Sequence, residues 1–394
     1  MDGTRGNEAP PDPSAASRGK GQGGDVRHAR IRASDLPLAG PAPAALAFIL
    51  GADGPSYRPV GAAMVVDRAG RVRGSLSSGC IDADIARHAA EVAARGRPRI
   101  LRYGAGSPFL DLELPCGGGL DVGVWPAPPA ARLKAWRAAL DGRRPLDLWL
   151  APDGAGAAPQ ADALLALRVD PDPRLAVFGK GPEALAFARM AAGAGYATTL
   201  VSPDPETLGA LGGGPARAVA LSPADPLEGV AIDAWTAGVL FFHDHDLEPP
   251  ILARLLAGPA FYVGAQGSRR TAARRIARLR AAGLAEAQLA RLRGPIGVIP
   301  STRDPRTLAA SVLAEVLAEA QAQAAAPSAG GEAAGPSARD DARDDAGASV
   351  GASAGDGAGD GAGGPQAKAA PAPPGSARRD CACRDCAPPG TCGA

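Results

Sequence analysis

Aromatic residues, net charge and long apolar segments are all scarce in this sequence of 394 residues. Phe, Trp and Tyr make up only 4% of the chain, which argues against a platform on which nucleic-acid bases stack. The 42 Lys and Arg nearly balance the 41 Asp and Glu, and the net charge of +1 excludes a basic coat for nucleic acid. The longest apolar runs, such as 42–50 and 237–242, are far shorter than the roughly 20 residues that cross a bilayer. We therefore expect no nucleic-acid partner and no membrane partner.

Targeting signals and cysteines are also sparse. The first 30 residues contain no apolar segment, so we expect no secretory signal and a cytoplasmic protein. Six cysteines in a long cytoplasmic chain do not indicate a disulfide framework. Two of them, Cys80 and Cys116, lie in the body of the sequence, and the other four crowd the last 14 residues.

Composition divides the chain into a folded body and two tails. Residues 1–25 are rich in Gly, Pro and Ser, and residues 323–394 in Ala, Gly, Ser, Asp and Pro, so both are predicted to be disordered. Clusters of Pro, Ala and Gly over 127–170, around one expected helix and a short apolar stretch at 146–150, predict a connector between a first domain, 26–126, and a second, 171–322. The 46% hydrophobic content is enough to give this body a sizeable core.

The first domain is predicted to be a small α+β unit. Apolar runs at 46–50 and 63–66 predict strands, and a turn at 67–70 leads into a further strand over 72–77. A helix is expected to follow and to end at Gly96. Its apolar stripe recurs at helical spacing, at Ile81, Ile85, Ala89 and Val92.

The second domain alternates strands and helices. Its expected strands are 175–178, 197–202, 239–242 and 261–264, and its expected helices are 182–192, 247–256, 271–282 and 304–322. Strands separated by helices of this length predict a parallel sheet with helices on both faces. The fold class is therefore α/β: a smaller N-terminal α+β domain followed by a Rossmann-like parallel-sheet domain, with disordered tails at both ends.

Cys80 lies directly after Gly79 at the predicted start of the first helix. Free N–H groups and partial positive charge at a helix N-terminus favour the thiolate, which attacks sulfur and binds soft metals. The alternative is a cysteine that packs as a small hydrophobic residue.

Cys116 is followed by three glycines, Gly117, Gly118 and Gly119. Glycines allow the backbone to approach a ligand and to turn its N–H groups inward, although a turn between two strands is the alternative. The two cysteines are 36 positions apart, which does not support a shared zinc site. Both occupy glycine-rich breaks, and both can face one pocket.

The loop after the first strand of the second domain resembles a dinucleotide-binding fingerprint. Gly179, Gly181 and Ala184 occupy its three small-residue positions, between a predicted strand and a predicted helix. Lys180 and Glu183 are unusual there, and the acidic residue after the next strand is displaced by two positions. These departures argue against NAD(P) binding.

Two segments that follow later strands lie at the predicted carboxyl edge of the sheet, where such folds bind ligands. Gly267, Ser268 and Arg269 open a helix and combine backbone donors with a guanidinium group, a suitable cradle for an anion. Residues 243–245 read His-Asp-His, which we interpret as a hydrogen-bonding turn rather than a metal site. A solvated helix face is expected for Arg274, Arg275 and Arg278.

The C-terminal tail holds cysteines at CxC and CxxC spacing: Cys381, Cys383, Cys386 and Cys392. This density suits metal binding or sulfur relay, whereas the alternative is a reduced, unstructured tail. Because no apolar residues surround the cluster, a site there would have to be organised by the metal itself.

These motifs, in this order, resemble the xanthine dehydrogenase accessory proteins, the XdhC/CoxI family. The similarity covers about residues 46–126 and 172–320. The family pattern S-G-G-C-hydrophobic-acidic is matched by residues 77–82, with Ser78 in place of the first glycine and Asp82 in place of glutamate. Further matching segments are 58–66, 115–122, 239–252, 262–270, 293–298 and 304–320.

The resemblance implies a molybdenum cofactor chaperone without turnover of its own. Such proteins bind the cofactor (molybdopterin), support its sulfuration by a cysteine desulfurase and help to load it into a xanthine dehydrogenase-type client enzyme. On this basis Cys80 and Cys116 would contact the cofactor and its molybdenum. Backbone contacts are implied for Gly117, Gly118 and Gly119. The loop patterns described above add further expected cofactor contacts at Gly79, Gly179, Gly181, Gly267, Ser268 and Arg269. A homodimer is compatible with the sequence.

Two other functions stay open from the residues alone. An NAD(P)-dependent oxidoreductase would use the Rossmann-like domain, and a sulfur or metal delivery protein would use the C-terminal cysteines. Against an enzyme, the four histidines do not supply a base within a catalytic set. His28 is assigned to the tail, and His88 is expected on the exposed side of its helix.

Overall fold

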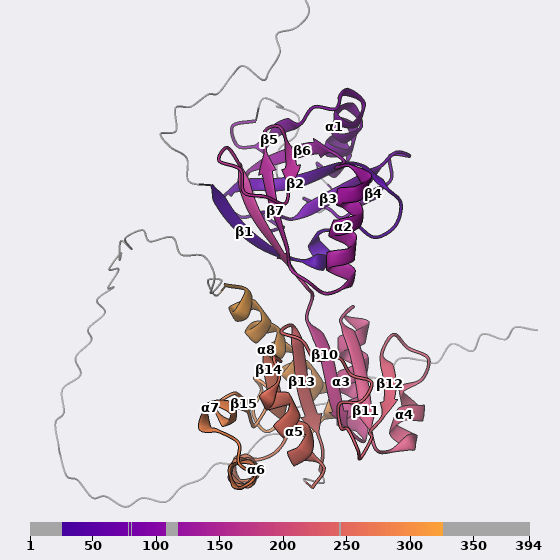
Figure 1. Ribbon diagram of the computed structural model, residues 1–394, viewed down its shortest axis with the longest axis vertical. Helices are drawn as coiled ribbons and strands as arrows, with labels where there is room; N and C mark the ends of the chain where they lie inside the picture. Colours follow the sequence, from indigo (N-terminus) through magenta and orange to yellow (C-terminus); the bar gives the residue numbers. More distant parts are fainter. Residues whose placement is uncertain (1–25, 78, 80, 108–116, 244–245, 326–394) are drawn as a thin grey trace, which may run out of the picture. The chain divides into compact units, whose positions relative to one another are not determined.

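The computed structural model describes residues 26–77, 79, 81–107, 117–243 and 246–325 (Figure 1). These residues form three sheets of four, five and six strands. The predicted disordered tails, 1–25 and most of 323–394, lie outside the described residues.

The five-stranded antiparallel sheet has the order β4-β3-β2-β6-β5. Its strands are β2 (Pro43–Asp53), β3 (Ala63–Asp67), β4 (Val72–Arg73), β5 (Arg99–Gly104) and β6 (Gly119–Pro126). Alternate residues of β2 enter two different cores, because successive side chains of a strand point to opposite faces. Ala47 and Ile49 pack in the core that contains the apolar stripe of α1 (Asp82–Arg95), whereas Leu46 and Phe48 pack in the other core.

The other core belongs to a four-stranded sheet of order β1-β9-β7-β8. Its elements are β1 (Arg27–Arg32), the 3-10 turn η2 (Ala33–Asp35), α2 (Ala130–Asp141), β7 (Leu146–Ala151), β8 (Gly154–Gly156) and β9 (Leu165–Asp170). β1 pairs in parallel with β9, although more than 130 residues separate them. Residues 127–170, predicted to be a connector, therefore contain a helix and three strands of a sheet. His28, assigned to the tail, lies in β1 with its ring 6.3 Å from that of Trp149.

The six-stranded sheet is parallel throughout and has the order β12-β11-β10-β13-β14-β15. Its elements, in chain order, are β10 (Arg174–Gly179), α3 (Pro182–Gly193), β11 (Ala197–Ser202), α4 (Pro205–Leu211), β12 (Arg217–Ala220), β13 (Thr236–Phe241), α5 (Glu248–Ala257), β14 (Tyr262–Ala265), α6 (Arg269–Ala281), α7 (Glu286–Leu289), β15 (Leu292–Arg293) and α8 (Pro305–Ala325). Counted along the chain, the order is 3-2-1-4-5-6, which defines a Rossmann fold. The predicted Rossmann-like domain is confirmed.

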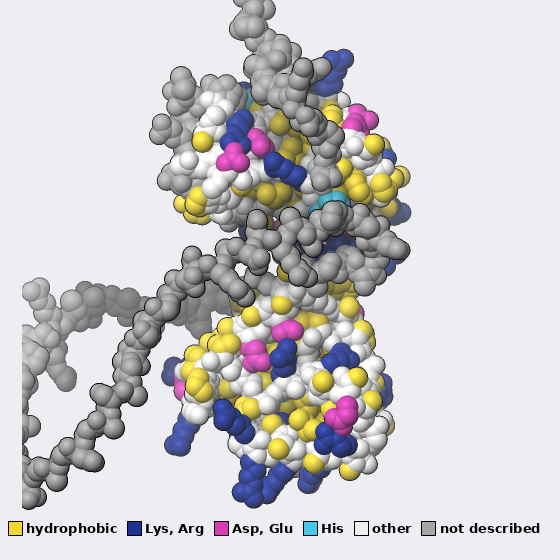
Figure 2. Space-filling model, turned by 90° about the vertical axis from the view of Figure 1, so that its left-hand side faces the viewer, with side chains coloured by type: hydrophobic (Ala, Val, Ile, Leu, Met, Phe, Trp, Pro, Cys, Tyr) yellow, Lys and Arg dark blue, Asp and Glu magenta, His cyan; other side chains and the backbone are white. Residues whose placement is uncertain are grey.

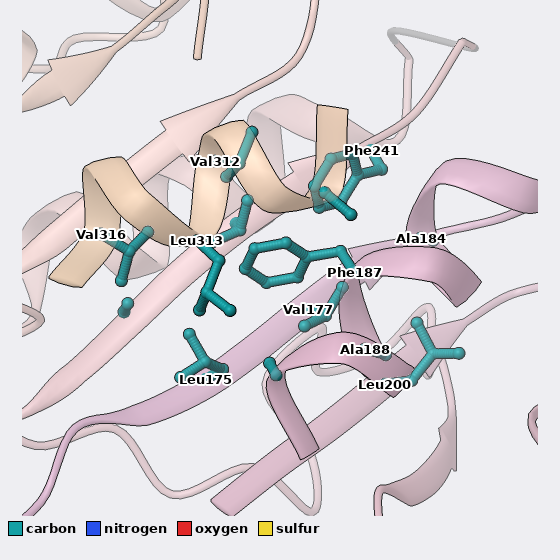
Figure 3. Close-up of a cluster of buried hydrophobic side chains, with 14 of the residues drawn as sticks. Leu175, Val177, Ala184, Phe187, Ala188, Leu200, Phe241, Val312, Leu313 and Val316 are labelled. Atoms are coloured by element: carbon teal, nitrogen blue, oxygen red, sulfur yellow. The ribbon is translucent and has the colours of Figure 1, made fainter. Parts of the chain in front are cut away.

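Helices cover both faces of this sheet, as the alternating pattern predicted. On one face, Phe187 of α3 and Leu313 of α8 pack over Val177 of β10 (Figure 3). On the other face, Leu255 of α5 and Leu279 of α6 share a second core. The strand order reverses between β10 and β13, and ligands of Rossmann folds bind at the carboxyl ends of these two strands.

Candidate functional site

The loop before α1 is held by one carboxylate. Asp82 accepts hydrogen bonds from Ser75 Oγ at 2.5 Å, from Leu76 N at 3.1 Å and from Ser77 Oγ at 3.0 Å. Ser77 Oγ in turn accepts the N–H of Ile81 at 3.1 Å. Sequence reasoning gave Asp82 no such role, although a short acidic residue after two serines is a signal for side-chain to backbone bonds. The loop therefore has a fixed shape around the position of Gly79.

Gly79 lies in open space within this loop. Its φ is 105°, a left-handed conformation that favours glycine, and no described atom comes within 4 Å of a Cβ added there. Cys80 and Ser78 lie outside the described residues. The described flanks thus present an exposed, glycine-permitted backbone at the start of α1.

The second glycine break precedes β6. Gly117 has a φ of 68° and an open Cβ position, and the carbonyl of Gly118 accepts the N–H of Ala105 at 3.1 Å. A Cβ on Gly119 would come within 2.0 Å of the Arg102 guanidinium, which lies over the strand and pairs with Asp121 at 3.0 Å. Cys116 lies outside the described residues.

Tyr103 links the flanks of the two loops. Its hydroxyl donates to Asp84 Oδ2, in the first turn of α1, at 2.7 Å, and in the sheet Tyr103 is opposite Leu120 of β6. Burial, reinforced by the hydrogen bond to Asp84, raises the pKa of Tyr103. Burial by itself would raise the pKa of Asp84, but hydrogen bonds from Arg87 and Tyr103 lower it. A residue four positions after Cys80 and one four positions after Cys116 are therefore connected through a single residue, Tyr103.

His88 was predicted to be exposed, and this prediction is wrong, because the residue is 2% exposed. It lies between Ile85 and Ala89 in the buried stripe of α1, and Arg99 NH1 is 3.0 Å from its Nδ1. Burial, followed by the charge of Arg99, lowers the pKa of His88. Position 88 lies on the apolar stripe at the 3.6-residue helical period, so the sequence already indicated that His88 is buried.

The glycine loop of the Rossmann domain uses its own donors. Gly181 has a φ of 82°, and its N–H donates to Thr207 Oγ1 at 3.0 Å, while the N–H of Lys180 donates to the carbonyl of Phe241 at 3.3 Å. Asp204 is the N-cap of α4 and accepts from Thr207, and these hydrogen bonds lower the pKa of Asp204. The loop thus offers fewer free N–H groups to a phosphate than a nucleotide-binding fingerprint does.

The segment between β14 and α6 forms the second predicted loop of this edge. Ser268 caps α6 by accepting the N–H of Thr271 at 3.1 Å, and Gly267 has a φ of 144°. Arg269 is exposed in the first turn. Figure 2 shows basic side chains gathered at the lower end of the view, where α6 lies in Figure 1. The capped helix start and its arginines keep the arrangement that was predicted to suit an anion.

Arg275 was predicted to lie on a solvated helix face, and this prediction is wrong, because the residue is 4% exposed. Its guanidinium makes two hydrogen bonds to the buried carboxylate of Glu248, at 2.7 and 2.9 Å, and a third to the carbonyl of Gln266 at 2.7 Å. Arg275 of α6 donates to the carbonyl of Gln266, in the loop that precedes this helix. The apolar periodicity of a single helix does not reveal such a contact. Arg275 therefore supports the loop that carries Gly267 and Ser268.

The described residues contain neither a cluster of metal ligands nor a membrane-spanning helix. Among them, no three His, Cys, Asp or Glu side chains lie together as a metal site. Asp244, His245 and the four tail cysteines lie outside this set. None of the helices within the described ranges is long and apolar enough to span a membrane.

The geometry defines an α/β protein in which glycine-rich loops, two of them next to cysteine positions, accompany a Rossmann domain with an altered phosphate loop. Two family models match the chain: the XdhC and CoxI family over residues 38–104, and the XdhC Rossmann domain over residues 175–316. The chain belongs to the XdhC and CoxI family, which confirms the resemblance drawn from its motifs.

One relative supports this assignment by its sequence, and one solved structure supports the fold. Molybdenum cofactor insertion chaperone PaoD of Escherichia coli (strain K12) is 34% identical over 276 residues, which cover 66% of this chain and 78% of that protein. A solved structure described as a xanthine dehydrogenase from Bacillus halodurans matches with a TM-score of 0.60 and 23% identity. The match covers 74% of this chain and 97% of that one, and it supports the fold.

Proposed function

We propose that this protein is a chaperone that binds the molybdenum cofactor and delivers it to a molybdoenzyme. One observation carries the proposal. The chain is 34% identical to a protein named as a molybdenum cofactor insertion chaperone, and the match covers 78% of that protein. Both family models and the Rossmann strand order agree with this assignment.

The glycine loops of the first domain are the proposed holding site for the cofactor. Open space at Gly79 and Gly117 admits a ligand against the backbone, and both glycines adjoin a cysteine in the sequence. A thiolate is a suitable donor to molybdenum or to its sulfur ligand. We therefore assign Cys80 and Cys116 to the metal end of the cofactor, with Gly79 and Gly117–Gly119 as backbone contacts.

The loops at the Rossmann sheet edge are the proposed contacts for the remainder of the cofactor. Gly267, Ser268 and Arg269 combine a helix N-terminus with a guanidinium group, which suits the phosphate that the pterin carries. Gly179 and Gly181 shape the neighbouring loop, where their small size permits close approach. A Cβ on Gly179 would come within 2.5 Å of the carbonyl of Phe241.

The remaining assignments follow from the proposed role. The client is a xanthine dehydrogenase-type enzyme, and a cysteine desulfurase supplies sulfur to the bound cofactor. The chain itself carries out no turnover and acts in the cytoplasm, and a homodimer is compatible with this role.

The test is to purify the chain from cells that make the cofactor and to measure molybdenum and pterin per chain. Cys80→Ser and Cys116→Ser should each lower both contents by at least about tenfold, since even losses in the outer shell of a metal site weaken it by that factor. Cys386→Ser in the tail is the matched control and should retain the wild-type content.

Three results would decide against this account. Unchanged retention in both single variants and in the double variant removes the two cysteines from the site. Loss of cofactor on deletion of residues 375–394 would favour delivery through the tail instead. Tight NAD(P) binding by the wild-type chain would favour an oxidoreductase.

A further inference from the structure

The Rossmann domain carries a carboxylate at the place where nucleotide-binding Rossmann folds hold a phosphate. Glu183 lies in the first turn of α3, next to the switch point between β10 and β13. Its Oε2 faces the glycine loop, since a Cβ added to Gly181 would lie 3.9 Å from it. Figure 3 labels Ala184, which follows Glu183 in α3, and Phe241 of β13.

The carboxylate of Glu183 lacks a donor within the described part of the chain. Its Oε2 is buried and accepts no hydrogen bond there, and the whole side chain is 16% exposed. Oε1 lies 3.6 Å from Nε2 of His243, which follows β13. A buried carboxylate oxygen without a donor is unfavourable, so this group is suited to a ligand that brings N–H groups.

An anion does not suit this position. The negative charge of Glu183 would repel a phosphate, and the N–H of Gly181 already donates to Thr207. The positive charge of Lys180 acts on a different carboxylate, that of Asp204. Hydrogen bonds from Thr207 lower the pKa of Asp204, and the charge of Lys180 lowers it further. The ligand chemistry that suits the carboxylate is therefore that of a group with hydrogen-bond donors.

We propose that Glu183, with His243 beside it, binds the paired N–H edge of a 2-amino-4-oxo heterocycle, the edge that guanine and pterin share. Two adjacent N–H groups match the two oxygens of one carboxylate, as the fork of a guanidinium does. The imidazole of His243 is 66% exposed, so it is accessible to a planar ligand. The choice of pterin rests on the proposed function, because the molybdenum cofactor carries this edge.

The experiment titrates the full-length protein with 6-methylpterin and follows quenching of the pterin fluorescence. Glu183→Gln replaces one acceptor oxygen with a donor, so it should weaken binding by about ten- to a hundredfold. The matched control is Glu206→Gln, in the exposed first turn of α4, which should bind pterin as the wild type does.

Two further ligands test whether the protein recognises the N–H edge and whether it prefers pterin to guanine. 6-Methyllumazine has oxygen in place of the 2-amino group, and it should bind the wild type about tenfold more weakly and show no further loss with Glu183→Gln. Guanosine that displaces pterin at equal affinity supports recognition of the edge alone, whereas tighter binding of pterin supports the cofactor as the ligand. Equal pterin affinity in the wild type and Glu183→Gln overturns the inference, as does the absence of saturable binding.

The readout separates this inference from the proposed function. A wild-type chain that retains molybdenum while Glu183→Gln still binds free pterin normally would contradict only the role of Glu183. A chain that retains no cofactor would contradict the chaperone function, whatever the pterin titration shows. Glu183→Gln should unfold at or above the wild-type temperature, because Oε2 has no hydrogen bond to lose and the substitution removes a buried charge.

Discussion

Arg275 is the residue whose environment differs most from its sequence context. It occurs among five other arginines of α6, yet it alone among them is buried, where it contacts Glu248 and Gln266. Arg275→Ala should lower the free energy of unfolding by about 3 kcal/mol or more, because removing one member of a buried ion pair leaves the other charge poorly compensated. Urea unfolding measures the effect.

The neighbouring residue supplies the control for this prediction. Arg274 is exposed on the same helix, so Arg274→Ala should change the free energy of unfolding by less than about 0.5 kcal/mol. Equal effects of the two substitutions would show that the contact between Arg275 and Glu248 does not stabilise the fold.

His88 gives the stability of the first domain a dependence on pH. Burial, then Arg99, lowers its pKa below the ordinary value of 6.5, so the folded protein binds this proton less readily than the unfolded chain does. The stability is fully present above about pH 6.5 and declines as the pH falls from there towards the folded pKa. The melting temperature should therefore drop between pH 7 and pH 5.

His88→Leu should make the melting temperature less dependent on pH in that interval. His28→Gln, at an exposed position of β1, is the control and should keep the wild-type profile. A profile for His88→Leu that coincides with that of the wild type would assign the acid sensitivity to other groups.

At the scale of elements, the sequence predicted many of those that repeat an apolar pattern, although β5, β6 and β9 also carry such a pattern and were not predicted. The stripe beginning at Ile81 predicts α1, and the run around Val239 predicts β13. β1 and β12 were missed because Arg27–Arg32 and Arg217–Ala220 are short and mix arginine with small residues. Their place in a sheet depends on partners far along the chain, β9 for one and β11 for the other.

Close approach of two elements also depends on single glycines. Gly179 ends β10 so near to β13 that an added Cβ would lie 2.5 Å from the carbonyl oxygen and 2.9 Å from the Cβ of Phe241. Gly179→Ala should therefore destabilise the protein by about 1–3 kcal/mol, because the backbone of β13 would have to shift.

Gly193→Ala is the control within the same domain. No described atom lies within 4 Å of the added Cβ, and alanine favours a helix, so this variant should be at least as stable as the wild type. Denaturant midpoints of both variants test the comparison. A neutral Gly179→Ala would show that the two strands can separate at the switch point without loss.

At the scale of the whole molecule, the first strand, β1, forms one edge of the four-stranded sheet. β1 pairs along its full length with β9, and Ile31 is buried in the shared core. Deletion of residues 1–32 should lower the free energy of unfolding by at least about 2 kcal/mol and reduce soluble yield, because it removes Ile31 and exposes the edge of β9. Deletion of residues 1–25 should have no such effect, and equal behaviour of the two truncations would contradict the role of β1.

The site was predictable from the sequence only in part. Gly79 and Gly117 were found from glycines that adjoin a cysteine, and the Rossmann loops from their position after apolar strands. The sequence did not show that Asp82 holds the first loop or that Tyr103 joins the flanks of both, because these contacts connect residues that no local pattern relates.

Transfer of molybdenum tests the central claim most directly. The chain, purified with its cofactor, is mixed with a cofactor-free molybdoenzyme of the xanthine dehydrogenase type and separated again, and molybdenum is measured in both proteins. We expect the metal and its pterin to leave this chain and appear in the client in equal amounts, faster than from free cofactor. Molybdenum that stays with the chain, or a client that fills no faster than with free cofactor, would contradict a role in insertion.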